Sequence, residues 1–130
     1  MKKLQEKWLK ILNSMKLTPL LMGMAMFLIG HILAFFQLNG QFLYKSFVKH
    51  EWAVAAAGVI LSFFYIWGTK YTVEAFSGLL WPGRFIGFGV GMVVYAIMVS
   101  YFFNEGINLK TLTSLILATG LVCVQVFWKI

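Results

Sequence analysis

Four long runs of apolar residues, each free of charged side chains, dominate the chain. They cover residues 17–44, 52–69, 85–104 and 111–128. A helix crosses a hydrocarbon core of about 30 Å with about 20 residues, and each run approaches or exceeds that length. The runs are apolar on all sides, whereas the strands of a membrane β-barrel alternate with period two. The pattern therefore predicts an all-α fold, a bundle of four transmembrane helices over about 18–37, 52–70, 78–103 and 109–128.

Residues 1–16 differ from the rest and are expected to form a separate unit ahead of the transmembrane domain at 17–130. Apolar residues recur there at helical spacing, and lysines occupy much of the remaining surface. Such a basic amphipathic helix lies in the headgroup layer, with its charged face toward anionic lipid. We expect a short interfacial helix that contacts lipid headgroups through Lys2, Lys3, Lys7, Trp8 and Lys10. The alternative is that these lysines only fix the topology and solvate a short tail.

Composition and charge agree with a membrane protein. Hydrophobic residues make up 61% of the chain and charged residues 12%, whereas soluble domains contain about 25% charged residues. Most basic residues fall on the side that both termini and the connector around Lys70 would share. The positive-inside rule then places both termini in the cytoplasm, at an inner or plasma membrane. Because one orientation is favoured, we expect a parallel homo-oligomer or a complex with another membrane protein, and no nucleic acid partner.

The residues needed for catalysis or cofactor binding are mostly missing from the sequence. Cys123 is the only cysteine, which excludes a CxxC redox pair. His31 is predicted at mid-span and His50 at a boundary, so they do not form a haem pair within one subunit. No two carboxylates fall within the spans, as a di-iron site or a paired-acid hydrolase would require. We expect no enzyme activity, no metal and no cofactor.

Arg84 and His31 are the polar residues whose presence within an apolar span most needs an explanation. An arginine at the bilayer centre costs about 3 kcal/mol. Arg84 either contacts a substrate, or reaches the interface or pairs with Glu74. Glu74 and Lys70 are the expected ion-pair or interface residues. His31 either hydrogen-bonds a neighbouring helix or relays protons. A break or kink is expected beside Arg84, because Pro82 removes a backbone donor.

Glycines mark the expected packing face of the third span. Gly83, Gly87 and Gly91 follow a GxxxGxxxG pattern, which places them on one side of a helix. Such patterns let two helix backbones approach closely in a membrane. Close packing is the preferred interpretation, and a flexible segment that contacts substrate is the alternative.

The second half of the chain resembles the small multidrug resistance family, the four-helix members of the drug/metabolite transporter superfamily. The residues that carry the resemblance are Gly89–Gly91, Tyr101–Glu105, Ile107–Leu109, Ser114 and Gly120, together with the spacing from Lys70 to Trp81. The resemblance implies that Trp81 faces substrate and that Ser114 and Gly120 lie on a dimer-forming fourth helix. About six residues around Pro82–Arg84 are extra relative to the family. The first helix also lacks the family's glutamate, because the matching window, Ile29–His31, holds no carboxylate.

Three functions remain open from the sequence. The first is an oligomeric, transporter-like protein that moves a small polar, anionic or zwitterionic solute along a path lined by His31, Trp81, Arg84 and Tyr95. The second is an accessory or structural subunit, or a lipid-binding protein, that moves nothing. The third is a small channel, in which the same residues form a ring around a symmetry axis.

Overall fold

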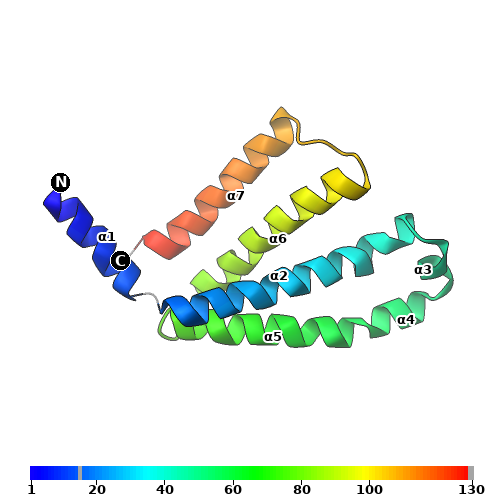
Figure 1. The fold of residues 1–130 in the computed structure, drawn as a ribbon, viewed down its shortest axis with the longest axis horizontal. Coiled ribbons are helices and arrows are strands. Elements are labelled where there is room, and N and C mark those ends of the chain that lie inside the picture. Colours follow the sequence, from blue (N-terminus) through cyan, green and yellow to red (C-terminus); the bar gives the residue numbers. More distant parts are fainter. Residues whose placement is uncertain (15, 129–130) are drawn as a thin grey trace.

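The computed structural model describes residues 1–14 and 16–128, and this part of the chain contains helices and no strand. The longer helices of this part of the chain are α1, α2, α5, α6 and α7, and shorter helical segments join α2 to α5 (Figure 1). In chain order the elements are α1 Lys2–Ser14, α2 Leu17–Asn39, the 3₁₀ turn η1 Gly40–Phe42, α3 Lys45–Lys49, α4 Glu51–Ala56, α5 Gly58–Ala75, α6 Trp81–Phe102 and α7 Leu109–Phe127.

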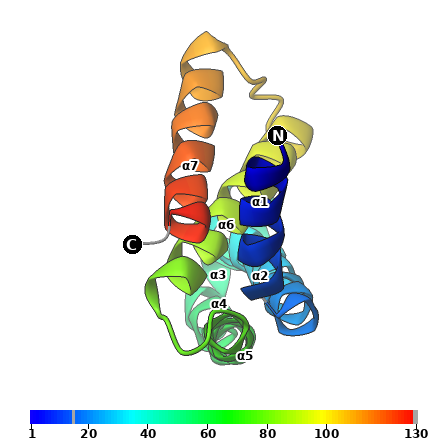
Figure 2. The same cartoon turned by 90° about the vertical axis from the view of Figure 1, so that its left-hand side faces the viewer.

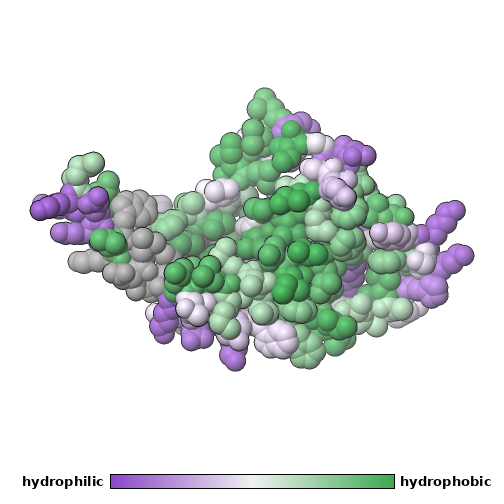
Figure 3. All heavy atoms as spheres, in the orientation of Figure 1, coloured by the Kyte–Doolittle hydropathy of each residue, from purple (hydrophilic) through white to green (hydrophobic). Residues whose placement is uncertain are grey.

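Within the described residues, four stretches are long and apolar enough to cross a membrane: Leu17–Phe42, Glu51–Ala75, Trp81–Phe102 and Leu109–Phe127. On the face shown in Figure 3, hydrophobic residues cover the middle of the molecule and hydrophilic residues gather mainly toward its edges. The predicted all-α fold, with a short helix ahead of four apolar helices, is confirmed. The chain is thus built as a small multi-pass membrane protein.

The sequence predicts one uninterrupted helix for the second span, but the structure divides this span into two helices. It is divided at Ala57 into α4 and α5. The Gln37 side chain of α2 donates a hydrogen bond of 3.2 Å to the Val54 carbonyl beside this junction. A Cβ added to Gly58 would lie 2.9 Å from Gln37 Nε2, so the glycine leaves room for that amide. A polar side chain of the first span therefore contacts the chain beside this interruption.

The break expected at Pro82 lies earlier in the chain. Residues 76–80 connect α5 to α6, and Ser77 and Gly78 adopt the left-handed φ values of 55° and 94° that reverse the chain. Pro82 occupies the first turn of α6, where a helix has no use for its missing N–H. The expectation of a kink within the third helix was wrong, because proline is tolerated in a first turn and disrupts only a helix interior.

The core forms where α2 packs against both α5 and α6 (Figure 2). Thr72 of α5 is fully buried there between two glycines. A Cβ added to Gly23 of α2 would lie 2.7 Å from Thr72 Cγ2, and one added to Gly83 of α6 would lie 2.6 Å from Thr72 Oγ1. Three helix backbones therefore approach closely around one small side chain.

α1 and α7 lie at the margins of this core. α7 packs against α6, and within Leu109–Phe127 only Ala118 is buried. α1 leads away from the four long helices (Figure 1), and Lys2, Lys3 and Lys7 are exposed on it. The side chains of Trp8 and Lys10 lie outside the described part of the structure. The backbone N–H of Lys16 donates to the Ala75 carbonyl at 3.1 Å, which ties the start of α2 to the end of α5.

Candidate functional site

An open-sided cavity of about 760 Å³ lies against α2, α5 and α6. α2 contributes Phe27 and His31, α5 contributes Tyr65 and Thr69, and most of the remaining lining comes from α6. The four candidate substrate-binding residues of the sequence all line this one cavity: His31, Trp81, Arg84 and Tyr95. Its volume lies within the range of small-molecule sites, about 300–1,000 Å³.

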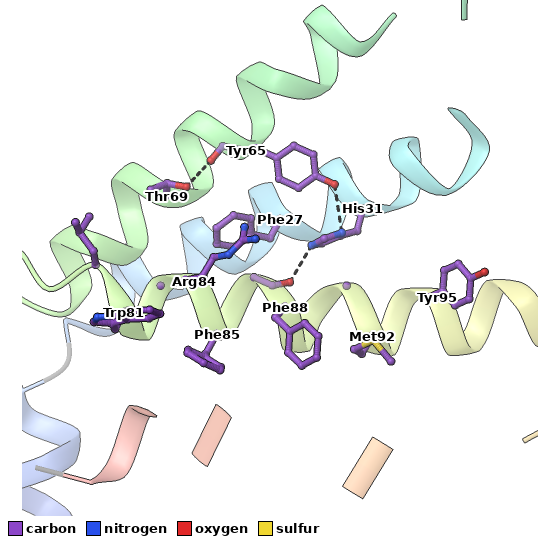
Figure 4. Close-up of a pocket in the computed structure, with 14 residues that line it drawn as sticks. Phe27, His31, Tyr65, Thr69, Trp81, Arg84, Phe85, Phe88, Met92 and Tyr95 are labelled. Carbon is purple, nitrogen blue, oxygen red and sulfur yellow. Dashed lines mark hydrogen bonds between the residues drawn. The ribbon is translucent and has the colours of Figure 1, made fainter. Parts of the chain in front are cut away.

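His31 connects the three helices of the cavity through both ring nitrogens (Figure 4). Nε2 donates to the carbonyl oxygen of Gly87 on α6 at 2.8 Å, and the Tyr65 hydroxyl of α5 donates to Nδ1 at 3.2 Å. These two bonds together fit a neutral imidazole that carries its proton on Nε2, because a carbonyl only accepts. Of the two roles open from the sequence, this geometry is the one of a side chain that hydrogen-bonds neighbouring helices.

The glycines of α6 form the wall through which α6 meets α2 and α5. A Cβ at Gly91 would lie 2.6 Å from His31 Cε1, and a Cβ at Gly87 would lie 3.3 Å from Phe27 Cζ. Gly83 lies against Thr72 in the same way. The GxxxGxxxG pattern thus faces the other helices of the same chain.

Ser114 and Gly120, the two small residues expected to pack on the fourth span, are not placed like the glycines of α6. A Cβ added to Gly120 would meet nothing within 4 Å. The Ser114 hydroxyl donates to the Lys110 carbonyl of its own helix at 3.1 Å. Both residues are exposed on α7, so they take no part in packing within one chain.

Arg84 extends from the first turns of α6 into the gap between α6 and α5 (Figure 4). Its guanidinium forms no hydrogen bond or ion pair with any residue that the structure describes, and no carboxylate lines the cavity. The pairing with Glu74 considered from the sequence does not form, and Glu74 is exposed. Lys70 also lacks an ion pair in the described chain, and its ammonium group lies 5.9 Å from the centroid of the Tyr71 ring. Arg84 therefore presents five unused N–H donors to the cavity.

Trp81 and Tyr95 lie toward opposite ends of the cavity. They are 14 residues apart on α6, which corresponds to about 21 Å along the helix axis. Trp81 is 68% exposed and packs against Phe85, with ring centroids 6.1 Å apart. The Tyr95 ring packs edge-on against Phe35 of α2 at 5.8 Å. One small solute does not reach both ends at once, so the four candidate residues line an elongated path rather than one compact site.

Several lining residues were not among the candidates from the sequence: Phe27, Tyr65, Thr69, Phe85, Phe88 and Met92. Nothing in the sequence separates Tyr65 from other aromatic residues of a membrane helix, because its partner His31 is 34 positions away. Phe85, Phe88 and Met92 share helical spacing with Trp81 and Tyr95, and that spacing is the one signal that could have identified them.

Metal-ligating and nucleophilic side chains do not gather in the cavity. Among the described residues, no group of three or more His, Cys, Asp or Glu side chains is placed to hold a metal ion. Cys123 is exposed on α7 and does not line the cavity. Comparisons with protein families, with curated proteins and with solved structures found no match to this chain.

Proposed function

We propose that this small multi-pass membrane protein is an oligomeric, transporter-like protein that carries a small anionic or zwitterionic solute through the cavity of α2, α5 and α6. The observation that carries the proposal is Arg84, a cation that has no partner among the described residues and lies in a cavity that no described carboxylate lines. The resemblance to the small multidrug resistance family agrees with transport. The positive charge of Arg84, however, favours an anionic solute over a drug cation.

The charge and donor geometry of Arg84, which is exposed near the start of α6, support a ligand of negative charge. A charged side chain within a membrane span costs about 2.5–3.5 kcal/mol at the centre and less toward the interface. Arg84 lies in the first turns of α6, and its donors fit carboxylate or phosphate oxygens in a bidentate geometry. A bound anion supplies the pairing that the protein itself does not.

Transport assays on liposomes containing the purified protein test this proposal. Inorganic phosphate, lactate and glycine are offered as solutes, with choline as the cationic comparison. We expect uptake of at least one anion or zwitterion, lost in Arg84→Gln and retained in Lys110→Gln, a control at the start of α7 outside the cavity. Uptake that is equal in Arg84→Gln and in the unaltered protein contradicts the proposal.

The alternative role of an accessory subunit has one observation of its own. The outer surface of α7 is apolar and uncovered, and Leu112, Ile116, Leu117, Leu121 and Val124 are all exposed there. A partner helix or lipid covers this surface in a membrane. Native mass spectrometry of the protein, extracted from its source in mild detergent, distinguishes the two: a second, different polypeptide supports the accessory role, and copies of this chain alone support the homo-oligomer.

Orientation and lipid contact belong to the same proposal. The basic bias of the termini and of the connector at Lys70 favours a cytoplasmic position for both ends, at an inner or plasma membrane. The exposed lysines of α1 then face the anionic headgroups of the cytoplasmic leaflet.

A further inference from the structure

The hydrogen-bonding groups left free in the cavity are concentrated at one end. Arg84 and the indole N–H of Trp81 lie there, and neither has a partner among the described residues. Farther along, both nitrogens of His31 are bound to Gly87 and Tyr65. The Thr69 hydroxyl is also engaged, since it donates to the Tyr65 carbonyl at 2.8 Å. A ligand thus meets its strong donors at the Arg84 end.

The rest of the path is apolar and long. Phe85, Phe88 and Met92 follow Arg84 along α6 and line the cavity, as does Phe27 of α2. The path continues to Tyr95, about 21 Å along the helix from Trp81, where a single tyrosine hydroxyl lies. A compact ion such as phosphate fills only the Arg84 end. A cavity of about 760 Å³ has room for a head group and one extended hydrocarbon chain.

The cavity opens sideways, between helices that could cross a membrane. α5 and α6 each belong to an apolar span, so the open side of the cavity faces the bilayer in a single chain. Phe88 is 42% exposed and Trp81 68% exposed at this opening. A hydrocarbon chain that leaves the lipid for this aromatic path exchanges one apolar environment for another. Selectivity therefore comes from the head group, because Arg84 is the one charged residue among the described residues that line the cavity.

We propose that the cavity binds an amphipathic anion: a phosphate or carboxylate head group at Arg84 and a single alkyl chain that runs past Phe88 toward Tyr95. The inference rests on the proposed function, an anion site at Arg84 in this cavity, and extends the ligand from a small anion to one that carries an alkyl chain. Two sources share this chemistry, a free single-chain amphiphile and an anionic bilayer lipid that inserts one of its chains. The order of head and chain follows from the position of Arg84 near the beginning of α6, close to the membrane surface.

Photo-crosslinking in phosphatidylcholine nanodiscs tests this inference on the full chain. The probe is hexadecyl phosphate with a diazirine on its chain, and hexadecanol with the same diazirine is the neutral comparison. A phosphatidic acid with the diazirine on one acyl chain tests the lipid source. Mass spectrometry locates the labelled residues in the unaltered protein, in Arg84→Gln, in Arg84→Lys and in the control Lys110→Gln. Circular dichroism and gel filtration verify that each variant is folded.

We expect the phosphate probe to label residues between Phe85 and Tyr95, at a level that Lys110→Gln does not change. Loss of a charge-assisted hydrogen bond predicts that Arg84→Gln lowers this labelling roughly 10- to 100-fold. Arg84→Lys retains part of it, because the charge remains. If the phosphatidic acid probe labels the same residues as hexadecyl phosphate, the ligand is a bilayer lipid. If hexadecyl phosphate alone labels them, the ligand is a free amphiphile. Either result supports the inference.

The inference is overturned if the phosphate probe labels the exposed faces of α6 and α7 in the same pattern as hexadecanol, whether or not Arg84 is present. It is also overturned if inorganic phosphate prevents labelling of the cavity at the same concentration as unlabelled hexadecyl phosphate. The alkyl chain would then add nothing to binding. In that second case the proposed transport of a small anion still stands. Both proposals fail together if no anion binds in a manner that depends on Arg84.

Discussion

Nε2 of His31 donates a hydrogen bond of 2.8 Å to the carbonyl oxygen of Gly87, and this bond joins α2 to α6 beside the cavity. The same ring accepts from the Tyr65 hydroxyl at 3.2 Å, which adds α5. Gly91 makes the geometry possible, because any side chain there would collide with the imidazole. One ring thus fixes the relative positions of the three helices that line the candidate site.

Replacement of His31 by Leu removes both hydrogen bonds of the imidazole and puts an apolar side chain of moderate size in its place. Interhelical hydrogen bonds in membranes contribute about 0.6 kcal/mol on average and up to about 1.7 kcal/mol. We expect His31→Leu to lower the free energy of unfolding by about 1–2 kcal/mol, and Tyr65→Phe to lower it by about 0.6 kcal/mol. Unfolding in mixed micelles, followed by circular dichroism, measures both. If the double variant loses the full sum of the two single losses, the two residues are not coupled and this interpretation is wrong.

Gly83 and Gly120 form a matched pair, since both lie within helices predicted to pack but only one meets a neighbour. A methyl group at Gly83 would lie 2.6 Å from Thr72 Oγ1, whereas one at Gly120 has nothing within 4 Å. Overpacking typically costs about 1–3 kcal/mol, so Gly83→Ala should destabilise the protein by that amount. Gly120→Ala should be neutral or slightly stabilising, because alanine favours a helix. Thermal unfolding in dilute detergent compares them, and equal effects would contradict the described packing.

The number and apolar character of the spans, and their helical structure, were predictable from the sequence, because each span is a long run without charged residues. The position of the break near Pro82 was not, since the left-handed residues Ser77 and Gly78 decide it and proline signals both a kink and a helix start. The cavity was predictable in part. Arg84 and His31 stand out as polar residues in apolar runs, but Tyr65 and Thr72 act through tertiary neighbours that no local pattern reveals.

Two connector glycines offer a second matched pair, Gly78 between α5 and α6 and Gly106 between α6 and α7. Gly78 has a φ of 94°, whereas Gly106 is not in the left-handed region, and a methyl group at either position would meet nothing within 4 Å. Alanine pays about 1–2 kcal/mol for a left-handed conformation. We therefore expect Gly78→Ala to lower the melting temperature and Gly106→Ala to leave it nearly unchanged. A lower melting temperature for Gly106→Ala alone would show that the α5–α6 turn does not depend on this backbone conformation.

Cys123 provides a direct test of the proposed parallel homo-oligomer. It is exposed on α7, five residues beyond the helix midpoint at Ala118. Two copies of α7 in contact and in the same orientation hold their thiols at the same depth, whereas an antiparallel pair separates them by about 15 Å along the axis. A disulfide requires Cα atoms within about 7 Å. Oxidation in native membranes should therefore give a dimer that Cys123→Ser abolishes, and a purely monomeric product would contradict pairing through α7.

We propose that Arg84 makes the cavity selective for anions, and thiol labelling at Thr69 measures this selectivity most directly. Thr69 lines the cavity on α5, and Thr119 on α7 is exposed outside it. In a Cys123→Ser background, Thr69→Cys is treated in membranes with an anionic and with a cationic methanethiosulfonate reagent, and Thr119→Cys serves as the control. We predict that the anionic reagent reacts several-fold faster at position 69, that Arg84→Gln removes this preference, and that position 119 resists both reagents. Equal rates for the two reagents with Arg84 in place, or no reaction at position 69, would contradict the account.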